Sequence, residues 1–70
     1  MSTKAKWLVL LETLHSARQT QGISNHKVDV IMGKQGTTSI AWEYEGRVPS
    51  ILGLLQWADA LGYDVRLVKR

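Results

Sequence analysis

The chain has 70 residues, of which 44% are hydrophobic, and its nine Lys and Arg outnumber six Asp and Glu for a formal net charge of +3. A chain of this length forms one domain, residues 1–70, with a single small core. The hydrophobic content is too high for a disordered chain, and the lack of cysteine excludes disulfides and thiolate metal sites. The longest apolar run, Trp7–Leu11, is far shorter than the roughly 20 residues of a membrane span. We therefore expect a soluble, cytoplasmic protein that does not enter a membrane.

The first predicted helix covers residues 4–21. Apolar residues recur there at i, i+3, i+4 and i+7, which places them on one helical face: Trp7, Leu10, Leu11 and Leu14. Gly22 follows in the position of a C-terminal glycine cap. Because Trp7 belongs to the apolar stripe, we expect it in the core.

Two shorter helices are predicted in the middle of the chain. The second helix covers residues 24–32, begins at a Ser24 N-cap and ends at Gly33. Its apolar stripe consists of Val28, Ile31 and Met32. A turn follows, and the third helix covers residues 36–44.

The fourth helix, residues 50–61, follows a Pro49-Ser50 start signal and has the clearest apolar stripe of the chain. Beyond Gly62, the tail of residues 63–70 alternates between apolar and polar residues, which predicts a short strand or an extended arm. Its apolar side consists of Tyr63, Val65 and Leu67. A lone strand leaves its backbone unpaired, so we expect it to pair, for example with its copy in a second subunit.

Two short helices joined by a glycine-bearing turn, between two further helices, indicate an all-α, four-helix domain containing a helix-turn-helix. Several segments fit this frame in detail: Arg18-x-x-x-Gly22-Ile23-Ser24, Val28-x-x-x-Met32-Gly33, Trp42-Glu43, Gly46-Arg47, Pro49-Ser50 and Leu54-Leu55-x-Trp57-Ala58-x-Ala60-Leu61-Gly62. In these segments the chain resembles the Cro and cI-repressor-like (XRE-type) helix-turn-helix regulators of phages and bacteria, over about residues 8–62. The resemblance implies a lambda-repressor-like fold.

The third helix has two possible registers, because one residue is inserted between Gly33 and Gly46 relative to the family. Counted from Gly33, a core position that is usually aliphatic falls on Ser39. Counted back from Gly46, Ile40 takes that position. Gly36 is a candidate for the inserted residue.

The resemblance also implies roles for three large side chains. Family members pair an Arg late in the first helix with a Glu late in the third, so we expect Arg18 to bind Glu43, with Glu45 as the second choice. Trp42 belongs to the core in one register and faces DNA or solvent in the other. Trp57 lies off the stripe of its helix and is expected either at the edge of the core or on a dimer surface.

The N-terminal residues of the third helix would read bases in the major groove. Gln bonds adenine in a bidentate manner, and Thr bonds a base edge or contacts the thymine methyl group. The expected base contacts are Gln35, Thr37, Thr38 and Ser39, together with Trp42 in the second register. The alternative is that this polar string is an ordinary turn.

Phosphate contacts are expected on either side of the third helix. The starts of the second and fourth helices offer free backbone N–H groups and a positive dipole end, and cations lie close to both. The candidates are Asn25, His26, Lys27, Lys34, Arg47 and Ser50. Each of them has an alternative role as a plain helix cap or as a solvated charge.

No catalytic motif is present, and His15 and His26 have no partner at metal-ligand spacing. We therefore expect no enzyme, cofactor, metal or small-molecule ligand. The expected function is a Cro-type phage repressor that binds double-stranded DNA as a homodimer in the bacterial cytoplasm, at the nucleoid. The dimer would form through the tail or through Trp57. The alternatives are an antitoxin-type autorepressor and a protein-interaction module without DNA binding, which the balanced charge of residues 24–49 and Gly36 favour.

Overall fold

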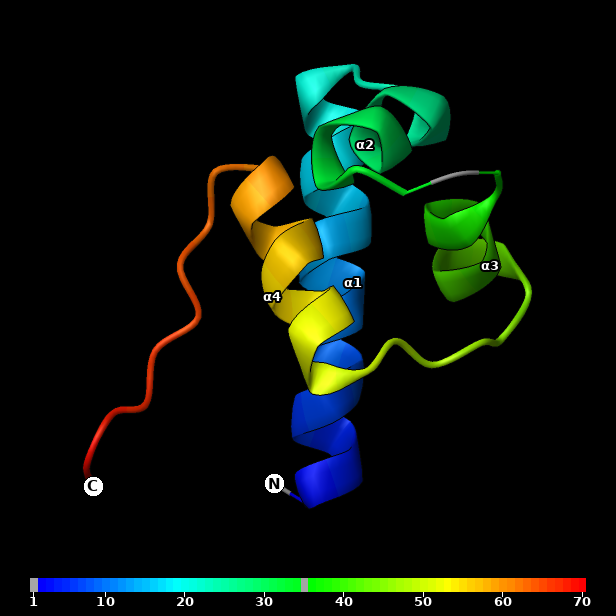
Figure 1. Cartoon of the computed structure of the whole chain (residues 1–70). Coiled ribbons are helices and arrows are strands. Elements are labelled where there is room, and N and C mark those ends of the chain that lie inside the picture. Colours follow the sequence, from blue (N-terminus) through cyan, green and yellow to red (C-terminus); the bar gives the residue numbers. More distant parts are fainter. Residues whose placement is uncertain (1, 35) are drawn as a thin grey trace.

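The computed structural model describes residues 2–34 and 36–70, and within these ranges it consists of four helices and no strand (Figure 1). The helices are α1 (Thr3–Gln21), α2 (Asn25–Met32), α3 (Thr38–Tyr44) and α4 (Ile51–Ala60). The prediction of an all-helical domain is confirmed, and the helix ends lie within two residues of the expected ones. None of the helices in the described ranges has the length and apolar content to cross a membrane.

Serine residues cap the starts of α1, α2 and α4. In each case the hydroxyl accepts a hydrogen bond from the backbone N–H three residues later, which satisfies one of the free donors at a helix start. The three pairs are Ser2 with Ala5, Ser24 with Lys27, and Ser50 with Gly53. Gly22 ends α1 and Gly33 ends α2 in the left-handed conformation, at φ of 68° and 71°, which glycine adopts without a steric penalty.

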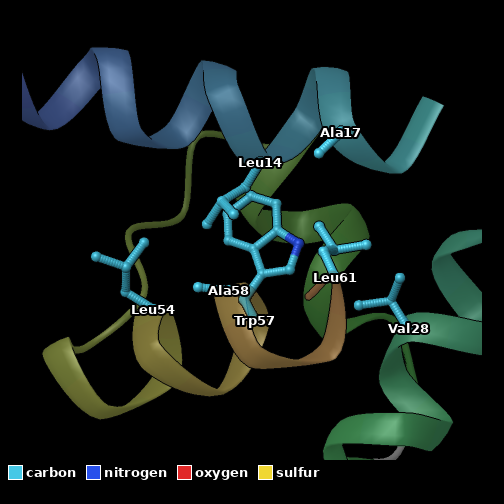
Figure 2. Close-up of a cluster of buried hydrophobic side chains, with 7 residues drawn as sticks. All are labelled: Leu14, Ala17, Val28, Leu54, Trp57, Ala58 and Leu61. Atoms are coloured by element: carbon cyan, nitrogen blue, oxygen red, sulfur yellow. The ribbon is translucent and has the colours of Figure 1, made fainter. Parts of the chain in front are cut away.

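The core lies between α1, α2 and α4 (Figure 2). It consists of Leu14, Ala17, Val28, Leu54, Trp57, Ala58 and Leu61. Trp57 is 0% exposed and is the largest fully buried side chain among the described residues, so of its two expected places the core is confirmed and the dimer surface is wrong. Trp7 packs against this cluster from α1, as expected, although it is only half-buried.

The tail leaves the end of α4 on the side of the molecule opposite to α3 (Figure 1). The Tyr63 N–H donates to the Ala58 carbonyl at 2.9 Å, and Tyr63 and Val65 line a groove beside Leu10 and Leu54. Beyond that point Leu67 is fully exposed. Residues 63–70 carry no regular secondary structure, so the extended-arm alternative fits and the strand is not formed in this single chain.

Candidate functional site

Four of the predicted contact residues share one shallow groove at the start and outer side of α3. Thr37, Thr38, Trp42 and Arg47 line this groove together with Ala41 and Glu45. Thr37 and Arg47 are exposed, and Thr38 is half-buried. The fold thus places two candidate base contacts beside one candidate phosphate contact. Gln35, the first of the predicted base contacts, lies outside the described residues.

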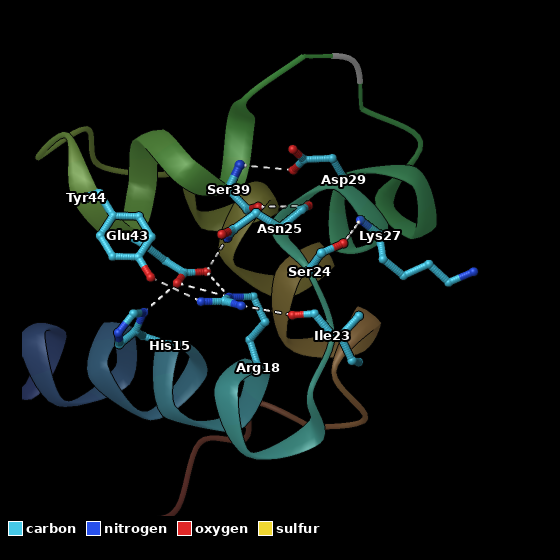
Figure 3. A network of polar contacts seen from close by, with 10 residues as sticks. All are labelled: His15, Arg18, Ile23, Ser24, Asn25, Lys27, Asp29, Ser39, Glu43 and Tyr44. Carbon is cyan, nitrogen blue, oxygen red and sulfur yellow. Dashed lines mark hydrogen bonds and ion pairs between the residues drawn. The ribbon is translucent and has the colours of Figure 1, made fainter.

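Ser39 cannot contact a base, because it is 0% exposed. Its hydroxyl donates to the backbone carbonyl of Asn25 at 3.2 Å, and its backbone N–H donates to Asp29 Oδ1 at 2.9 Å (Figure 3). The second residue of α3 therefore points at α2. The prediction of a base contact by Ser39 is wrong because the side chain is part of the α2–α3 contact.

The burial of Ser39 also decides the register of α3. Glu43, four residues later on the same face, also has a fully buried side chain. The Trp42 ring packs on Trp57, with ring centroids 5.4 Å apart, and its edge lies against Gly53. Trp42 therefore belongs to the edge of the core, and the alternative in which it faces DNA is wrong.

Glu43 joins α1, α2 and α3 (Figure 3). Arg18 Nε donates to both of its carboxylate oxygens, at 2.9 and 3.1 Å, so the predicted partner of Arg18 is confirmed. His15 Nδ1 contacts Glu43 Oε1, and the His15 ring meets the Tyr44 ring edge-on. His15 and Arg18 of α1 are thereby tied to one buried carboxylate of α3.

Arg18 completes its hydrogen bonds with two further acceptors. Nη1 donates to the Ile23 carbonyl at 2.8 Å and Nη2 to the Tyr44 hydroxyl at 3.2 Å. The hydrogen bond to Glu43 raises the pKa of Arg18, and partial desolvation opposes this effect. The guanidinium is thus a permanent cation whose role is to hold α3 and the loop before α2 against α1.

Asn25 faces the protein rather than a phosphate. Its Nδ2 donates to Ser39 Oγ at 3.1 Å and to Glu43 Oε2 at 2.7 Å. These two bonds use both hydrogens of the side-chain amide. The Asn25 side chain is therefore not available to a phosphate, because it links α2 to α3, and a contact through the backbone N–H groups of this helix start stays a prediction.

The remaining phosphate candidates keep their accessibility. His26, Lys27, Arg47 and Ser50 are exposed and Lys34 is half-exposed, and the Lys27 chain extends away from the polar network in Figure 3. Ser50 also caps α4, so its hydroxyl has a structural role besides any contact with a ligand. His26 and Lys27 lie at the start of α2, Lys34 lies just after its end, and Arg47 and Ser50 lie between α3 and α4.

Sequence reasoning missed two acidic residues near this surface. Asp29 is 2% exposed and accepts a hydrogen bond from the start of α3. In the sequence it is a charged residue next to the apolar stripe of its helix, and nothing there indicates that it is buried. Glu45 lies in the groove with Thr37 and Arg47, whereas the family resemblance gives it only the role of a second partner for Arg18. Its sequence proximity to Arg47 was the available signal.

The described parts of the chain hold no group of three or more His, Asp or Glu side chains placed to bind a metal ion. The exposed donors around α3 are hydroxyl and cationic groups, which suit hydrogen bonding to an anionic or base-bearing partner. In comparisons with known proteins, no family model, curated protein or solved structure matches this chain.

Proposed function

We propose that the chain is a sequence-specific regulator that binds double-stranded DNA in the cytoplasm of a bacterial host. In this proposal, α2 and α3 form a lambda-repressor-like helix-turn-helix, and α3 is the reading helix. The observation that carries the proposal is the groove in which Thr37 and Thr38 stand beside Arg47. Threonines at a helix start contact base edges, and a neighbouring arginine neutralises the backbone phosphate.

The cations around α3 support this proposal. Lys27 lies on α2, Lys34 in the turn after α2, and Arg47 in the loop after α3. Each neutralised phosphate releases counterions, so binding should weaken as the salt concentration rises. A Cro-type repressor controlled by its own concentration is the form we propose, and an antitoxin-type autorepressor makes the same contacts.

The test compares two classes of variant on a duplex selected from random sequences. Thr37→Ala with Thr38→Ala should reduce the preference for that duplex over its single-base variants by about 1–3 kcal/mol per lost contact. Thr20→Ala, an exposed threonine on α1, is the matched control and should leave the preference unchanged.

Arg47→Ala and Lys34→Ala should instead weaken binding to all duplexes alike and lower the dependence on salt. Lys6→Ala, on the exposed side of α1, should do neither. Fluorescence anisotropy at several salt concentrations measures both effects. If the affinity for every duplex is independent of salt, the proposal is wrong.

We further propose that the protein acts as a homodimer through its tail. Leu67 and Val68 are 103% and 84% exposed, and the extended backbone of residues 63–70 can pair with a second strand. Removal of residues 63–70 should give a monomer in sedimentation experiments, with α1–α4 intact by circular dichroism. If the truncated chain remains dimeric, the exposed Ile51 and Leu52 of α4 are the next candidates.

One observation favours a second function, a protein-interaction module that does not bind DNA. Glu45 places a negative charge in the same groove as Thr37 and Arg47, where it opposes a phosphate. The exposed apolar residues of α4 offer such a module a contact surface. Absence of binding to any duplex, with a folded protein, would support this alternative.

A further inference from the structure

The start of α3 differs from the starts of the other three helices. Ser2, Ser24 and Ser50 have extended backbones and cap their own helices. Thr37, at the same position before α3, has φ −116° and ψ 39° and makes no side-chain cap hydrogen bond within the described residues. Threonine is an effective N-cap, so its failure to cap needs a structural reason.

Asp29 supplies the missing cap from a different helix. It lies on α2 and is 2% exposed, and its Oδ1 accepts the backbone N–H of Ser39 at 2.9 Å (Figure 3). Ser39 is the second residue of α3, whose N–H an N-cap side chain ordinarily binds. The cap of α3 is therefore delivered by the neighbouring helix.

Burial of the Asp29 carboxylate costs free energy, which an apolar side chain at this position would not. Asp29 Oδ2 is buried and has no hydrogen-bond partner among the residues that the structure describes, and a buried charge is unfavourable unless it is compensated. The Ser39 N–H and the positive end of the α3 dipole provide the compensation at this position. The contact between Asp29 and Ser39 thus fixes the start of α3 relative to α2.

We propose that Asp29 is the positioning residue of the reading helix, which caps α3 so that the Thr37 hydroxyl stays available for a base edge. The inference rests on the proposed DNA-binding function and adds a division of labour to it. The carboxylate of Asp29 offsets the positive end of the α3 dipole. The start of α3 therefore contacts bases, and Lys27, Lys34 and Arg47 contact phosphates. Thr37 is exposed and lines the groove with Arg47, as this division requires.

The first experiment measures capping without DNA. If Thr37 does not cap, Thr37→Ala should melt within about 2 °C of the wild type, whereas Ser50→Ala, which removes a true cap, should melt about 4–8 °C lower. Equal losses in the two variants would overturn the proposal. This comparison needs no variant of Asp29, so it remains decisive even if such variants fail to fold.

The second experiment compares Asp29→Asn and Asp29→Ala, with Asp59→Ala on the exposed side of α4 as the control. Asparagine keeps an acceptor for the Ser39 N–H, so in Asp29→Asn the amide exchange rate of Ser39 and the base preference should both equal those of the wild type. In Asp29→Ala, we expect the Thr37 hydroxyl to turn and cap the helix. The Ser39 amide should then exchange about tenfold faster, and the preference at the base pair contacted by Thr37 should fall about fivefold or more.

The salt dependence should be the same in the wild type, in both Asp29 variants and in the control, since no phosphate contact is changed. If the wild type has a base preference that Asp29→Ala retains, the role of Asp29 is wrong and DNA binding stands. If the wild type binds no duplex, the proposed function fails and the role of Asp29 in reading fails with it, whatever the exchange rate of Ser39.

Discussion

Two sets of contacts hold this domain together, and they differ in chemistry. α1 and α4 meet through apolar side chains such as Leu14, Leu54 and Trp57. α3 is held to α1 and α2 mainly through hydrogen bonds and an ion pair, centred on Glu43 and Ser39. Only Trp42 connects α3 to the apolar cluster with a large side chain.

The two kinds of contact have different effects on the stability of the domain and on the orientation of α3. Apolar burial is roughly proportional to area and has no preferred direction, so the contact between α1 and α4 supplies free energy and tolerates small shifts. Hydrogen bonds require particular distances and angles, and buried polar groups are costly when they lose a partner. We infer that the apolar contact keeps the domain folded and that the polar contact fixes the angle of α3.

The largest effect is expected from the apolar side. Trp57→Ala should lower the free energy of unfolding by about 3–5 kcal/mol, because it empties the centre of the core. A small domain has only about 5–15 kcal/mol in total, so the variant should be close to unfolded. Urea titration followed by circular dichroism measures the change. Leu55→Ala, on the exposed face of the same helix at 42% exposure, should lose far less, and equal losses would contradict the assigned core.

The next effect is expected from the ion pair. Arg18→Ala should lower the free energy of unfolding by about 3 kcal/mol, because it leaves the buried carboxylate of Glu43 without its main partner. Arg47→Ala, at an exposed arginine, should change it by less than about 0.5 kcal/mol. Chemical denaturation measures both, and an Arg18→Ala variant that keeps wild-type stability but loses DNA binding would show that Arg18 contacts DNA instead.

The pH dependence of the Arg18 contribution follows from the direction of its shift. The folded state raises the pKa of Arg18, so the contribution is fully present below the pKa of an unfolded arginine and is lost as the pH rises through the folded value. Arginine stays protonated in the neutral range. The difference between wild type and Arg18→Ala should therefore be constant from about pH 7 to about pH 9.

A smaller loss should follow from the polar contact of α2 with α3. Ser39→Ala removes the hydroxyl that pairs twice with Asn25, and it should lower the free energy of unfolding by about 1–3 kcal/mol. Ser16→Ala, at an exposed serine of α1, should have almost no effect. Amide exchange of α3 should rise more than that of α1 in Ser39→Ala, and a uniform rise would show that the contact does not act locally on α3.

The smallest effect concerns the point where α3 meets α4. A Cβ at Gly53 would lie 3.2 Å from two atoms of the Trp42 ring. Gly53→Ala gains helix propensity of about 1 kcal/mol, and displacement of the ring opposes that gain, so the net change in stability should be below about 1 kcal/mol. In a Trp42→Phe background the opposing contact is smaller, and Gly53→Ala should become more stabilising. A thermal-melting cycle over the four proteins checks this coupling.

The apolar half of this molecule could be predicted from the sequence, and the polar half largely could not. The spacing locates Leu14 and Leu54 in the core, although Leu10 and Ile31, which belong to the predicted stripes of the first two helices, are exposed. Trp57 lies off the expected stripe and yet is buried, because α4 packs against both α1 and Trp42 and so needs a wider apolar face than one stripe. The spacing of apolar residues along a helix predicts the face that packs on one neighbouring element. It does not predict a second packing face.

The contacts of α3 join residues that are far apart in the chain. Asn25 and Ser39, like His15 and Glu43, pair only after the helices have packed, and isolated polar residues in a sequence are typical of a surface. Arg18 and Glu43 could be paired because a family resemblance supplied the partner. The alternation of the tail leaves a strand and an extended arm open, and the single chain has the extended arm.

The stacking of Trp42 on Trp57 has an optical consequence. The two indole rings come from α3 and α4, with centroids 5.4 Å apart and planes inclined by 44°. Electronic transitions of aromatic rings this close and inclined to each other couple, and they give paired circular-dichroism bands of opposite sign that a separated pair does not show. The domain therefore carries a label-free signal for the docking of α3, which would disappear if that helix swung away while the helical content stayed the same.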